Sequence, residues 1–467
     1  MNKKNILIIV SDQLSQKALP TYGNNYVQTP NIDRIANGAI VFNECYTPYP
    51  LCQPARAALW SGRLPHQTKI ESNGRNHFVP PYPSELPTLG SIFAEAGYDT
   101  THFGKTHDAG TLRGFRVEPE CALEVEGSDA FPVNYDTKRD RYTTVKVVDY
   151  LSKQNEKPYL LIADLQNPHD ICNWVGHNKG VHKNIPIDKE LPALPDNFYT
   201  SDFKSRPKPV QYICCSHRRQ CQATGWTEDN YRQYLAAYYH YIERLDAEIG
   251  LILDALEKRN DAKDTLIVFL ADHGDGMAAH GLVTKQVSFY EETTHVPLFF
   301  KGQGFRTDRN TAHQLVSLMD ILPTLCDYAE LETPEGLWGK SLLPILKGEN
   351  EFEVHEYIVS EWLTEWGFTM EPGRMIRTRN YKYMKYLEEN AEELYNISED
   401  RGEQTNLISS PECKSILEHH RSALQEYINT TGDNFNSIDF KIDSRWRSHK
   451  PGYENHTGVD APTAMTK

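Results

Sequence analysis

One cysteine, Cys52, stands in a proline-bracketed turn of the segment TPYPLCQPARAALWSGRLPH, residues 47–66. Proline suits the first turn of a helix, so this segment predicts a helix that begins close to Cys52. The unpaired N–H groups and the dipole at a helix N-terminus favour anions and activate a nucleophile placed there. Arg56 follows one turn later and could bind two oxygens of a tetrahedral oxyanion. The alternative is a partly buried free thiol.

Two apolar runs end in similar pairs of polar residues. The run NILIIV leads into Asp12 and Gln13, and the run TLIVFLA leads into Asp272 and His273. Open α/β sheets bind ligands at the carboxyl ends of their strands, and neighbouring strands would bring these four side chains together. Such oxygen and nitrogen donors suit a hard divalent cation such as Ca²⁺, with the imidazole as the unusual member. The alternative is that both aspartates cap the turns that follow them.

Four basic side chains lie beyond the ends of predicted strands. Lys105 and His107 are two residues apart in HFGKTHD, and His169 follows the apolar run YLLIADL. Lys285 lies a short distance after the second of the two polar pairs. Any one of these groups could be a solvated surface charge, the commoner role of a basic residue. Together with Arg56, they predict an anion pocket beside the cation.

The composition restricts the classes of partner. The 467-residue chain carries a formal net charge of -15, whereas nucleic-acid-binding proteins present a basic face, so no nucleic-acid partner is expected. The longest apolar runs have the length of strands, far short of a membrane span, so no membrane partner is expected either. An anionic substrate must therefore be attracted by a local cluster of basic residues.

The N-terminal segment MNKKNILIIVSDQ has two lysines and a short apolar run without a small-residue cleavage site. We expect a first β-strand here rather than a signal peptide. On this interpretation the protein is cytoplasmic, and it would be periplasmic if a leader had been removed from a longer precursor. The nine cysteines are an odd number spread over a long chain, so no disulfide scaffold is expected. The segment CCSHRRQC matches no zinc spacing, and a loop is the preferred interpretation.

Strand-length apolar runs alternate with helical patterns, which predicts an α/β sheet with helices on both faces. The expected strands cover residues 4–10, 39–46, 99–104, 158–166 and a segment from 265, and the expected helices cover 31–38, 86–98, 143–154 and 227–259. Residues 172–226 are rich in Pro, Lys and Cys without periodicity, and they predict an inserted loop region.

Beyond residue 350 the pattern changes to short strand-like segments and a helix near 411–430. This pattern predicts a smaller C-terminal subdomain with an antiparallel sheet. We therefore expect a catalytic domain over residues 1–350 and a C-terminal subdomain over residues 351–467.

The segment CQPARAALWSGR, residues 52–63, resembles the sulfatase signature, in which Cys-x-Pro-Ser/Ala-Arg precedes a Ser/Gly-Gly-Arg turn. The similarity extends over nearly the whole chain and includes NILIIVSDQ, TPNIDRIANGAIVFNECYT, GKTH, ADHGD, YEETTHVPLFF, VSLMDILPTL and IRTRNYKYMKY. The sequence is thereby identified as similar to the type I sulfatases of the alkaline-phosphatase-like superfamily. The resemblance implies the fold of that superfamily, a large mixed sheet sandwiched by helices with a smaller C-terminal subdomain.

The resemblance also implies that Cys52 is oxidised to formylglycine by a maturation enzyme that reads the adjacent proline and arginine. A hydrated aldehyde has two hydroxyl groups on one carbon. One attacks sulfur and displaces the alcohol, and the other then loses its proton and expels sulfate. The partners implied are therefore a sulfated saccharide as substrate and a formylglycine-generating enzyme.

By the family pattern, Asp12, Gln13, Cys52, Asp272 and His273 hold Ca²⁺, which acts as a Lewis acid. Two departures bear on this assignment. Many members carry Asp-Asp at the first pair and Asp-Asn at the second, whereas this chain has Asp-Gln and Asp-His. Relatives that cleave phosphonates and phosphodiesters share part of this alteration and use Mn²⁺ or Zn²⁺, so these ions are the alternatives to Ca²⁺.

The resemblance assigns catalytic roles to the basic residues. Arg56 would orient the formylglycine, and Lys105 and Lys285 would neutralise the sulfate. His107 would be the base for sulfate elimination, and His169 or Lys285 would be the acid for the leaving oxygen.

Seven further residues are candidates for reading the rest of the substrate: Arg75, His77, Asp170, Trp174, His177, Arg218 and Arg219. A tryptophan beside polar groups suits a sugar ring, and additional basic residues suit a uronate or a second sulfate. The alternative for each is an ordinary exposed loop. The Asp-Gln and Asp-His pairs are similar to those of bacterial glycosaminoglycan sulfatases, including uronate 2-O-sulfatases, so an oligosaccharide derived from a glycosaminoglycan is the favoured substrate.

Three functions are therefore considered. The first is a sulfuric ester hydrolase acting on a sulfated carbohydrate. The second is a phosphonate monoester or phosphodiester hydrolase on the same scaffold. The third is a binding relative without catalysis, which the intact set of catalytic candidates disfavours.

Overall fold

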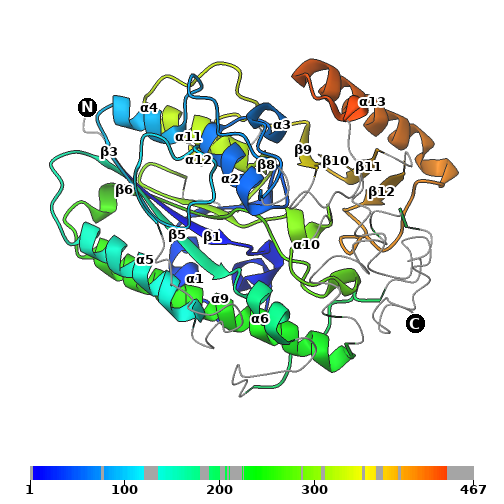
Figure 1. Cartoon of the computed structure of the whole chain (residues 1–467), viewed down its shortest axis with the longest axis horizontal. Coiled ribbons are helices and arrows are strands. Elements are labelled where there is room, and N and C mark those ends of the chain that lie inside the picture. Colours follow the sequence, from blue (N-terminus) through cyan, green and yellow to red (C-terminus); the bar gives the residue numbers. More distant parts are fainter. Residues whose placement is uncertain are drawn as a thin grey trace.

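The computed structural model describes residues 4–74, 78–119, 135–178, 189–199, 206–207, 210, 223, 226–285, 288–306, 311–349, 353–363, 372–387 and 391–438. Its largest element is an eight-stranded sheet at the centre of the molecule (Figure 1). The strands are β1 (Asn5–Asp12), β2 (Ile40–Tyr46), β3 (Asp99–Gly104), β4 (Arg116–Pro119), β5 (Tyr159–Pro168), β6 (Thr265–Ala271), β7 (Leu298–Lys301) and β8 (Thr311–Ser317).

The strand order is β4-β3-β5-β1-β6-β7-β2-β8. The strands β4, β3, β5, β1 and β6 are parallel to one another, whereas β7 runs antiparallel to both of its neighbours. Every residue of β1, β5 and β6 is buried, as expected for parallel strands covered on both faces. The carboxyl ends of these central strands therefore meet at one edge of the sheet, where ligands of α/β proteins bind.

Helices cover both faces of this sheet (Figure 1). One layer contains α1 (Pro30–Ala36), α5 (Tyr135–Leu151), α6 (Ile171–Asn178) and α9 (Glu228–Glu257). The other layer contains α2 (Cys52–Ser61), α4 (Leu89–Glu95), α11 (Ile321–Tyr328) and α12 (Leu343–Leu346). Among the described helices, none combines the length and the apolar character that crossing a membrane requires.

The two helices that matter most for the site have identifiable local causes. Helix α2 begins at Cys52 with Pro54 in its first turn, and it ends before Gly62, whose φ of 66° is the left-handed conformation that favours glycine. Helix α9 begins after Thr227, whose N–H donates to Asn230 Oδ1 at 2.8 Å. Its apolar and tyrosine-rich face packs against the sheet and becomes part of the main core.

A second sheet follows in the chain and is antiparallel throughout. Its strands are β9 (Tyr357–Trp362), β10 (Gly373–Thr378), β11 (Tyr381–Tyr386) and β12 (Glu392–Asn396), in the order β12-β11-β10-β9. Helix α13 (Lys414–Thr431) packs on this sheet and buries Leu424 and Tyr427 (Figure 1). Two short helices, α3 (Pro65–Thr68) and α10 (Glu291–Thr294), lie between the larger elements.

The predicted fold class is confirmed, with a large mixed sheet between helices and a separate antiparallel sheet after it. The insertion predicted as a loop over 172–226 differs at its start, where residues 171–178 form α6. The boundary between residues 350 and 351 stays a prediction, and the segment CCSHRRQC lies outside the described residues.

Candidate active site

Cys52 lies where the carboxyl ends of β1 and β6 meet. It is the first residue of α2 and is completely buried. Its Sγ atom lies 3.2 Å from His273 Nε2 and 3.8 Å from Asp12 Oδ1, and it accepts a hydrogen bond of 2.8 Å from Lys285 Nζ. The helix predicted from the PAR sequence thus presents residue 52 to side chains at two strand ends.

The surroundings of Cys52 favour an anion. Burial alone would raise the pKa of the thiol, but Lys105, Lys285 and His273 outweigh burial and lower this pKa well below its ordinary value. His107 lowers the pKa further through a hydrogen bond to the thiol. The position therefore stabilises a negatively charged nucleophile or a bound anion.

Four potential metal ligands surround one point. Asp12 ends β1, and Asp272 directly follows β6. Ser11 pairs in register with Ala271 on the adjacent strand, so the two aspartates lie at the same level of the sheet edge. One donor atom from each of four buried residues lies within 4.8 Å of the other three; these residues are Asp12, Cys52, Asp272 and His273. The two strand ends predicted to converge therefore do so.

The chemistry of these donors fits a divalent cation. His273 Nδ1 donates to the carbonyl of Gly274 at 2.8 Å, so Nε2 is the atom that would bind a cation when the imidazole is neutral. Burial, with the charge of Asp12, raises the pKa of Asp272 to about 6, which shows that the two carboxylates repel each other. A cation would relieve this repulsion, and two carboxylates with one imidazole make a donor set for Ca²⁺, Mn²⁺ or Zn²⁺.

Gln13, the fifth predicted ligand, has its side-chain amide bound elsewhere. Its Nε2 donates to Asp275 Oδ2 at 2.7 Å, and its Oε1 accepts a contact of 3.2 Å from Cys172 Sγ. Its backbone has a φ of 68° and donates to Asp272 Oδ1 at 3.0 Å. The backbone of Gln13 is therefore bound to one ligand of the cluster, and the metal role of its amide stays a prediction.

Arg56 connects the cluster to a third carboxylate. Its Nε donates to Asp272 Oδ2 at 3.0 Å, its Nη2 donates to Asp12 Oδ2 at 3.2 Å, and its Nη1 donates to Asp164 Oδ2. Burial would lower the pKa of Arg56, but Asp164, Asp272 and Asp12 raise it well above its ordinary value. The guanidinium is therefore a permanent buried cation held in a fixed orientation.

The other basic residues converge on the same point. Lys105 follows β3, and its Nζ donates to Asp12 Oδ2. Gln166 Nε2 lies 2.7 Å from His169 Nδ1, and the imidazole hydrogen-bonds Cys52. Burial, together with two nearby lysines, lowers the pKa of His169 to about 3, so this imidazole is neutral in the free protein.

The loop that carries Asp272 rests on a second segment of backbone. Gly274 N donates to Thr293 O at 2.8 Å, and Asp275 N donates to Glu292 O at 3.0 Å. A Cβ atom at Gly274 would lie 2.0 Å from that carbonyl of Glu292, so this close approach requires glycine. The segment around α10 therefore sets the position of the loop that carries Asp272.

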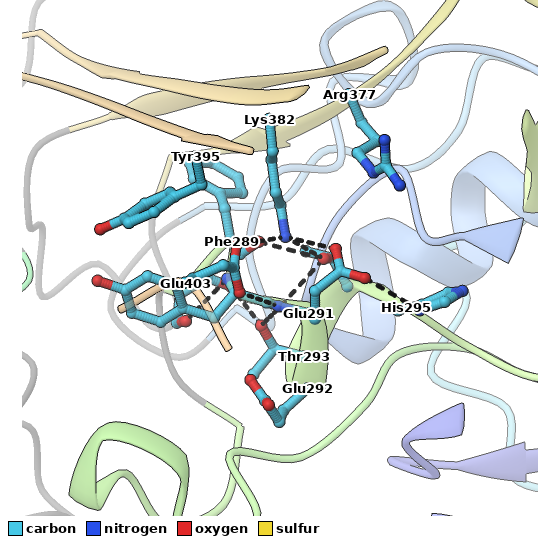
Figure 2. Close-up of polar contacts among 12 residues, drawn as sticks. Phe289, Glu291, Glu292, Thr293, His295, Arg377, Lys382, Tyr395 and Glu403 are labelled. Atoms are coloured by element: carbon cyan, nitrogen blue, oxygen red, sulfur yellow. Dashed lines mark hydrogen bonds and ion pairs between the residues drawn. The ribbon is translucent and has the colours of Figure 1, made fainter. Parts of the chain in front are cut away.

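Buried charges fasten this segment to the C-terminal sheet. Figure 2 shows Lys382 of β11 pointing toward Glu291 and Glu403, and its Nζ lies 2.9 Å from a carboxylate oxygen of each. Glu403 Oε2 also accepts a hydrogen bond of 2.7 Å from the backbone of Glu291. All three side chains are completely buried.

The structure places the predicted substrate-reading residues unevenly. Arg75, His77, Arg218 and Arg219 lie outside the described residues, and only the backbone of His177 is described, within α6. Asp170 is buried near the start of the same helix.

Trp174 packs into the protein instead of facing outward. Its side chain is 8% exposed, and its ring meets Trp226 edge-on at 6.0 Å and Tyr234 at 6.3 Å. The structure therefore gives this indole a packing contact, and its role in binding a sugar stays a prediction. The physical reason for this packing is that α6 folds onto α9 and buries the ring.

Two acidic residues of the site were not predicted from the sequence. Asp164 binds Arg56 from within β5, and Asp275 accepts hydrogen bonds from Gln13 and from Tyr234 Oη. The signal for Asp164 is a carboxylate inside the otherwise apolar run YLLIADL, where an unpaired charge would be costly.

Comparison with known proteins gives the family. The profile named Sulfatase matches residues 4–331 of the chain. The chain belongs to the sulfatase family. A second profile, N-sulphoglucosamine sulphohydrolase, C-terminal, matches residues 278–430 of this sulfatase, including the antiparallel sheet. The protein is therefore a sulfuric ester hydrolase, as the signature around Cys52 predicted.

Individual relatives agree with this assignment. The sulfatase is 45% identical to the Delta 4,5-hexuronate-2-O-sulfatase of Bacteroides thetaiotaomicron over 98% of this chain and 96% of the relative. It is 28% identical to a choline-sulfatase of Rhizobium meliloti over 88% of this chain and 83% of that one. The solved structure of a 2-O GAG sulfatase superposes with a TM-score of 0.91 at 45% identity, covering 98% of this chain and 99% of that chain. A phosphonate monoester hydrolase of Agrobacterium radiobacter shares the fold, with a TM-score of 0.77 at 20% identity and coverage of 92% and 96%.

Proposed function

We propose that this sulfatase hydrolyses the 2-O-sulfate ester of a hexuronate in an oligosaccharide derived from a glycosaminoglycan. The observation that carries the hydrolytic part is the buried cluster of Asp12, Cys52, Asp272 and His273, with cationic side chains directed at the same point. The support for the 2-O position is the relative that is 45% identical over 98% of this chain and named for that reaction.

The proposal includes oxidation of Cys52 to formylglycine by a maturation enzyme and a Ca²⁺ ion at the buried cluster. Asp12, Asp272, His273 and residue 52 would hold the ion, which when bound supplies Lewis-acid stabilisation of a sulfate oxygen. A formylglycine hydrate supplies a hydroxyl nucleophile on a carbon that can later release sulfate without attack by water on sulfur.

The positions of the basic residues suggest a separate catalytic role for each. Lys285 Nζ lies 2.8 Å from Cys52 Sγ and Lys105 lies against Asp12, so both ammonium groups would face the sulfate oxygens. His107 hydrogen-bonds the side chain at position 52 and would take the proton whose loss expels sulfate.

The acid that protonates the leaving sugar oxygen is either His169 or Lys285. Burial and the two lysines lower the pKa of His169 to about 3, so the imidazole is neutral before substrate binds. It can donate one hydrogen bond as a neutral group, whereas Lys285 can deliver a proton directly. The variants His169→Asn and Lys285→Met separate the two, because loss of the acid should be rescued by substrates with a good leaving group such as an aryl sulfate.

The substrate assignment is tested by turnover of defined sulfated disaccharides. We expect release of sulfate from a uronate 2-O-sulfate, with kcat/KM at least about 100-fold above that for N- or 6-O-sulfated glucosamine, because buried polar groups left unpaired reject the wrong ligand. Desulfated disaccharide analysis by mass spectrometry identifies the position removed. Preferential release from glucosamine would reject the 2-O assignment and leave the sulfatase assignment intact.

A phosphonate monoester or phosphodiester hydrolase is the second candidate. The amide of Gln13 favours it, because it stands where many family members carry a second carboxylate and so lowers the negative charge of the metal site. Comparing an aryl sulfate with an aryl phosphonate of the same leaving group decides between the candidates. Faster turnover of the phosphonate, accompanied by stoichiometric Mn²⁺ or Zn²⁺, would favour this second function.

A further inference from the structure

Asp164 is a charged residue in the middle of the core. It lies on β5 between Val10 of β1 and Gly104 of β3, its partners in register, and it is 1% exposed. Its Oδ2 accepts hydrogen bonds from Arg56 Nη1 and, at 3.2 Å, from His102 Nε2. A carboxylate at this depth is costly unless it is paired, so its position requires an explanation.

The partner of Asp164, Arg56, also binds two residues of the candidate metal cluster. The guanidinium binds three carboxylates through three different nitrogens, and two of them, Asp12 and Asp272, belong to the cluster that surrounds the cation site. Asp164 stands outside that cluster and has no other cation in contact among the described residues than Arg56 and the imidazole of His102. Asp164 is therefore the carboxylate that can remain bound to Arg56 when a cation binds Asp12 and Asp272.

His102 completes the arrangement from the neighbouring strand. It lies on β3 two residues before the end of that strand, and it is completely buried. Within the described part of the chain, His102 Nδ1 and Asp164 Oδ1 have no hydrogen-bond partner. A pair that served packing alone would be replaced at lower cost by apolar residues, since each unpaired buried polar atom destabilises the fold.

We propose that Asp164 is a positioning residue of the sulfatase: it holds Arg56, with His102 holding Asp164, and thereby leaves Asp12 and Asp272 available to the cation. This inference rests on the proposed function of the cluster. Without Asp164, the guanidinium would be balanced only by the two metal ligands, and it would compete with the cation for their oxygens. Arg56 would then lose its orientation toward residue 52.

The decisive variant is Asp164→Asn, prepared as the full chain with formylglycine at position 52. We expect Ca²⁺ affinity, measured by titration calorimetry after chelation, to fall by about 10- to 100-fold, as is typical when an outer partner of a metal site is removed. Turnover of an aryl sulfate at saturating Ca²⁺ should show a lower kcat, with KM changing less, because the loss concerns the orientation of Arg56.

Asp246→Asn is the matched control. Asp246 is also buried, but it binds the backbone of Asn31 and Ile32 at the start of α1, remote in the chain from the cluster. This variant should lower the melting temperature and leave Ca²⁺ affinity and kcat unchanged. Equal effects of both variants on Ca²⁺ affinity would overturn the proposal, since they would reflect general destabilisation.

Two further measurements extend the test, and the first of them does not depend on the folding of Asp164→Asn. His102→Asn removes the imidazole that binds Asp164 and leaves the carboxylate of Asp164 in place. We expect Ca²⁺ affinity to fall in this variant too, by about tenfold or less. In an Arg56→Lys background, Asp164→Asn should change Ca²⁺ affinity far less than in the wild type, because lysine lacks the nitrogen that Asp164 binds. Unchanged Ca²⁺ affinity in His102→Asn would overturn the proposal, and so would additive effects in the double variant.

The wild type in the same series separates the two levels of inference. A formylglycine-containing wild type that neither binds a cation at the cluster nor hydrolyses any sulfate ester would refute the proposed function of the site. If the wild type binds a cation and hydrolyses a sulfate ester, and Asp164→Asn has the same Ca²⁺ affinity and kcat, only the positioning role is refuted.

Discussion

At the scale of single residues, three cations are buried beside Cys52 although the whole protein is acidic. The chain has a formal net charge of -15, yet Lys105, Lys285 and Arg56 are buried at one point. Burial would be costly for each of these cations, and each is stabilised by contact with a carboxylate or the thiol. The positive charge beside Cys52 is therefore held locally by these contacts and does not depend on the net charge of the protein.

The first prediction concerns Cys52. Cys52→Ala should abolish turnover, because no hydroxyl nucleophile can form at that position, and Cys52→Ser should do so unless the maturation enzyme oxidises serine. Intact-protein mass spectrometry of active enzyme should show the mass loss of thiol to aldehyde. Wild-type protein made without the maturation enzyme is the control, and full activity from an unmodified thiol would refute the formylglycine assignment.

The second prediction concerns the cation. Chelation should remove activity and Ca²⁺ should restore it, because Asp12 and Asp272 offer oxygen ligands. The folded protein should also gain about 2.7 kcal/mol of stability at a Ca²⁺ concentration 100 times the Kd, visible as a higher melting temperature. Stoichiometric Zn²⁺ or Mn²⁺ in active preparations, with no response to Ca²⁺, would contradict this metal assignment.

Site residues at strand ends could be predicted from the sequence, whereas a site residue within a strand could not. Asp12 and Asp272 could be paired because both follow long apolar runs, and parallel neighbours end at one edge. Asp164 could not be paired, because its partner Arg56 comes from another segment and only the three-dimensional arrangement brings them together. The burial of Trp174 could not be predicted for the same reason, since it depends on the packing of α6 against α9.

At the scale of elements, the central strands and the long helix were predictable because their apolar patterns are long. Helix α6 was not, since eight residues give too little periodicity and its stability comes from tertiary packing. The contact between α10 and the C-terminal sheet was also beyond the sequence. It depends on Lys382, Glu291 and Glu403, which lie far apart in the chain and meet as buried charges.

The third prediction tests this contact between elements. Lys382→Met should reduce the free energy of unfolding by about 1–3 kcal/mol, because it removes the buried ammonium that both Glu291 and Glu403 contact, although Glu291 keeps its 3.1 Å contact with His295. Urea denaturation measures the loss. Arg379→Met, in the turn between β10 and β11, is the control, since Arg379 and Glu353 form an exposed pair worth less than about 1 kcal/mol. Similar losses in both variants would show that Lys382 has no special part in joining the elements.

At the scale of the whole molecule, a second buried cluster joins the segment after the active-site helix to the C-terminal sheet. His66 of α3 lies 2.7 Å from Glu361 Oε1 of β9, which also accepts a hydrogen bond of 2.6 Å from Tyr427 of α13. Arg374 of β10 binds both carboxylate oxygens of Asp433, at 2.7 and 2.8 Å. The cluster therefore couples the position of α2 and α3 to the packing of α13 on its sheet.

This cluster should make the stability of the whole molecule depend on pH. Burial would lower the pKa of His66, but Glu361 raises it to about 9, whereas a histidine in the unfolded chain titrates near 6.5. The stabilisation is therefore complete below about pH 6.5 and is lost as pH rises through 9. Burial would raise the pKa of Glu361, but His66 and then Arg374 lower it to about 2, so its contribution is complete above about pH 4.5 and is lost only in strong acid.

The fourth prediction follows from the pH ranges in which His66 and Glu361 stabilise the fold. The difference in unfolding free energy between wild type and His66→Gln should be largest near about pH 5.5, and it should shrink by on the order of 3 kcal/mol by about pH 10, because the wild type alone loses a bound proton there. Denaturant titrations of both proteins across this range measure the difference. His419→Gln is the control for removal of a histidine, because His419 is exposed on α13 and belongs to no ion pair among the described residues. A difference for His66→Gln that stays flat with pH would mean that the imidazole supports α3 by packing and hydrogen bonding, and that its charge does not join the two parts of the molecule.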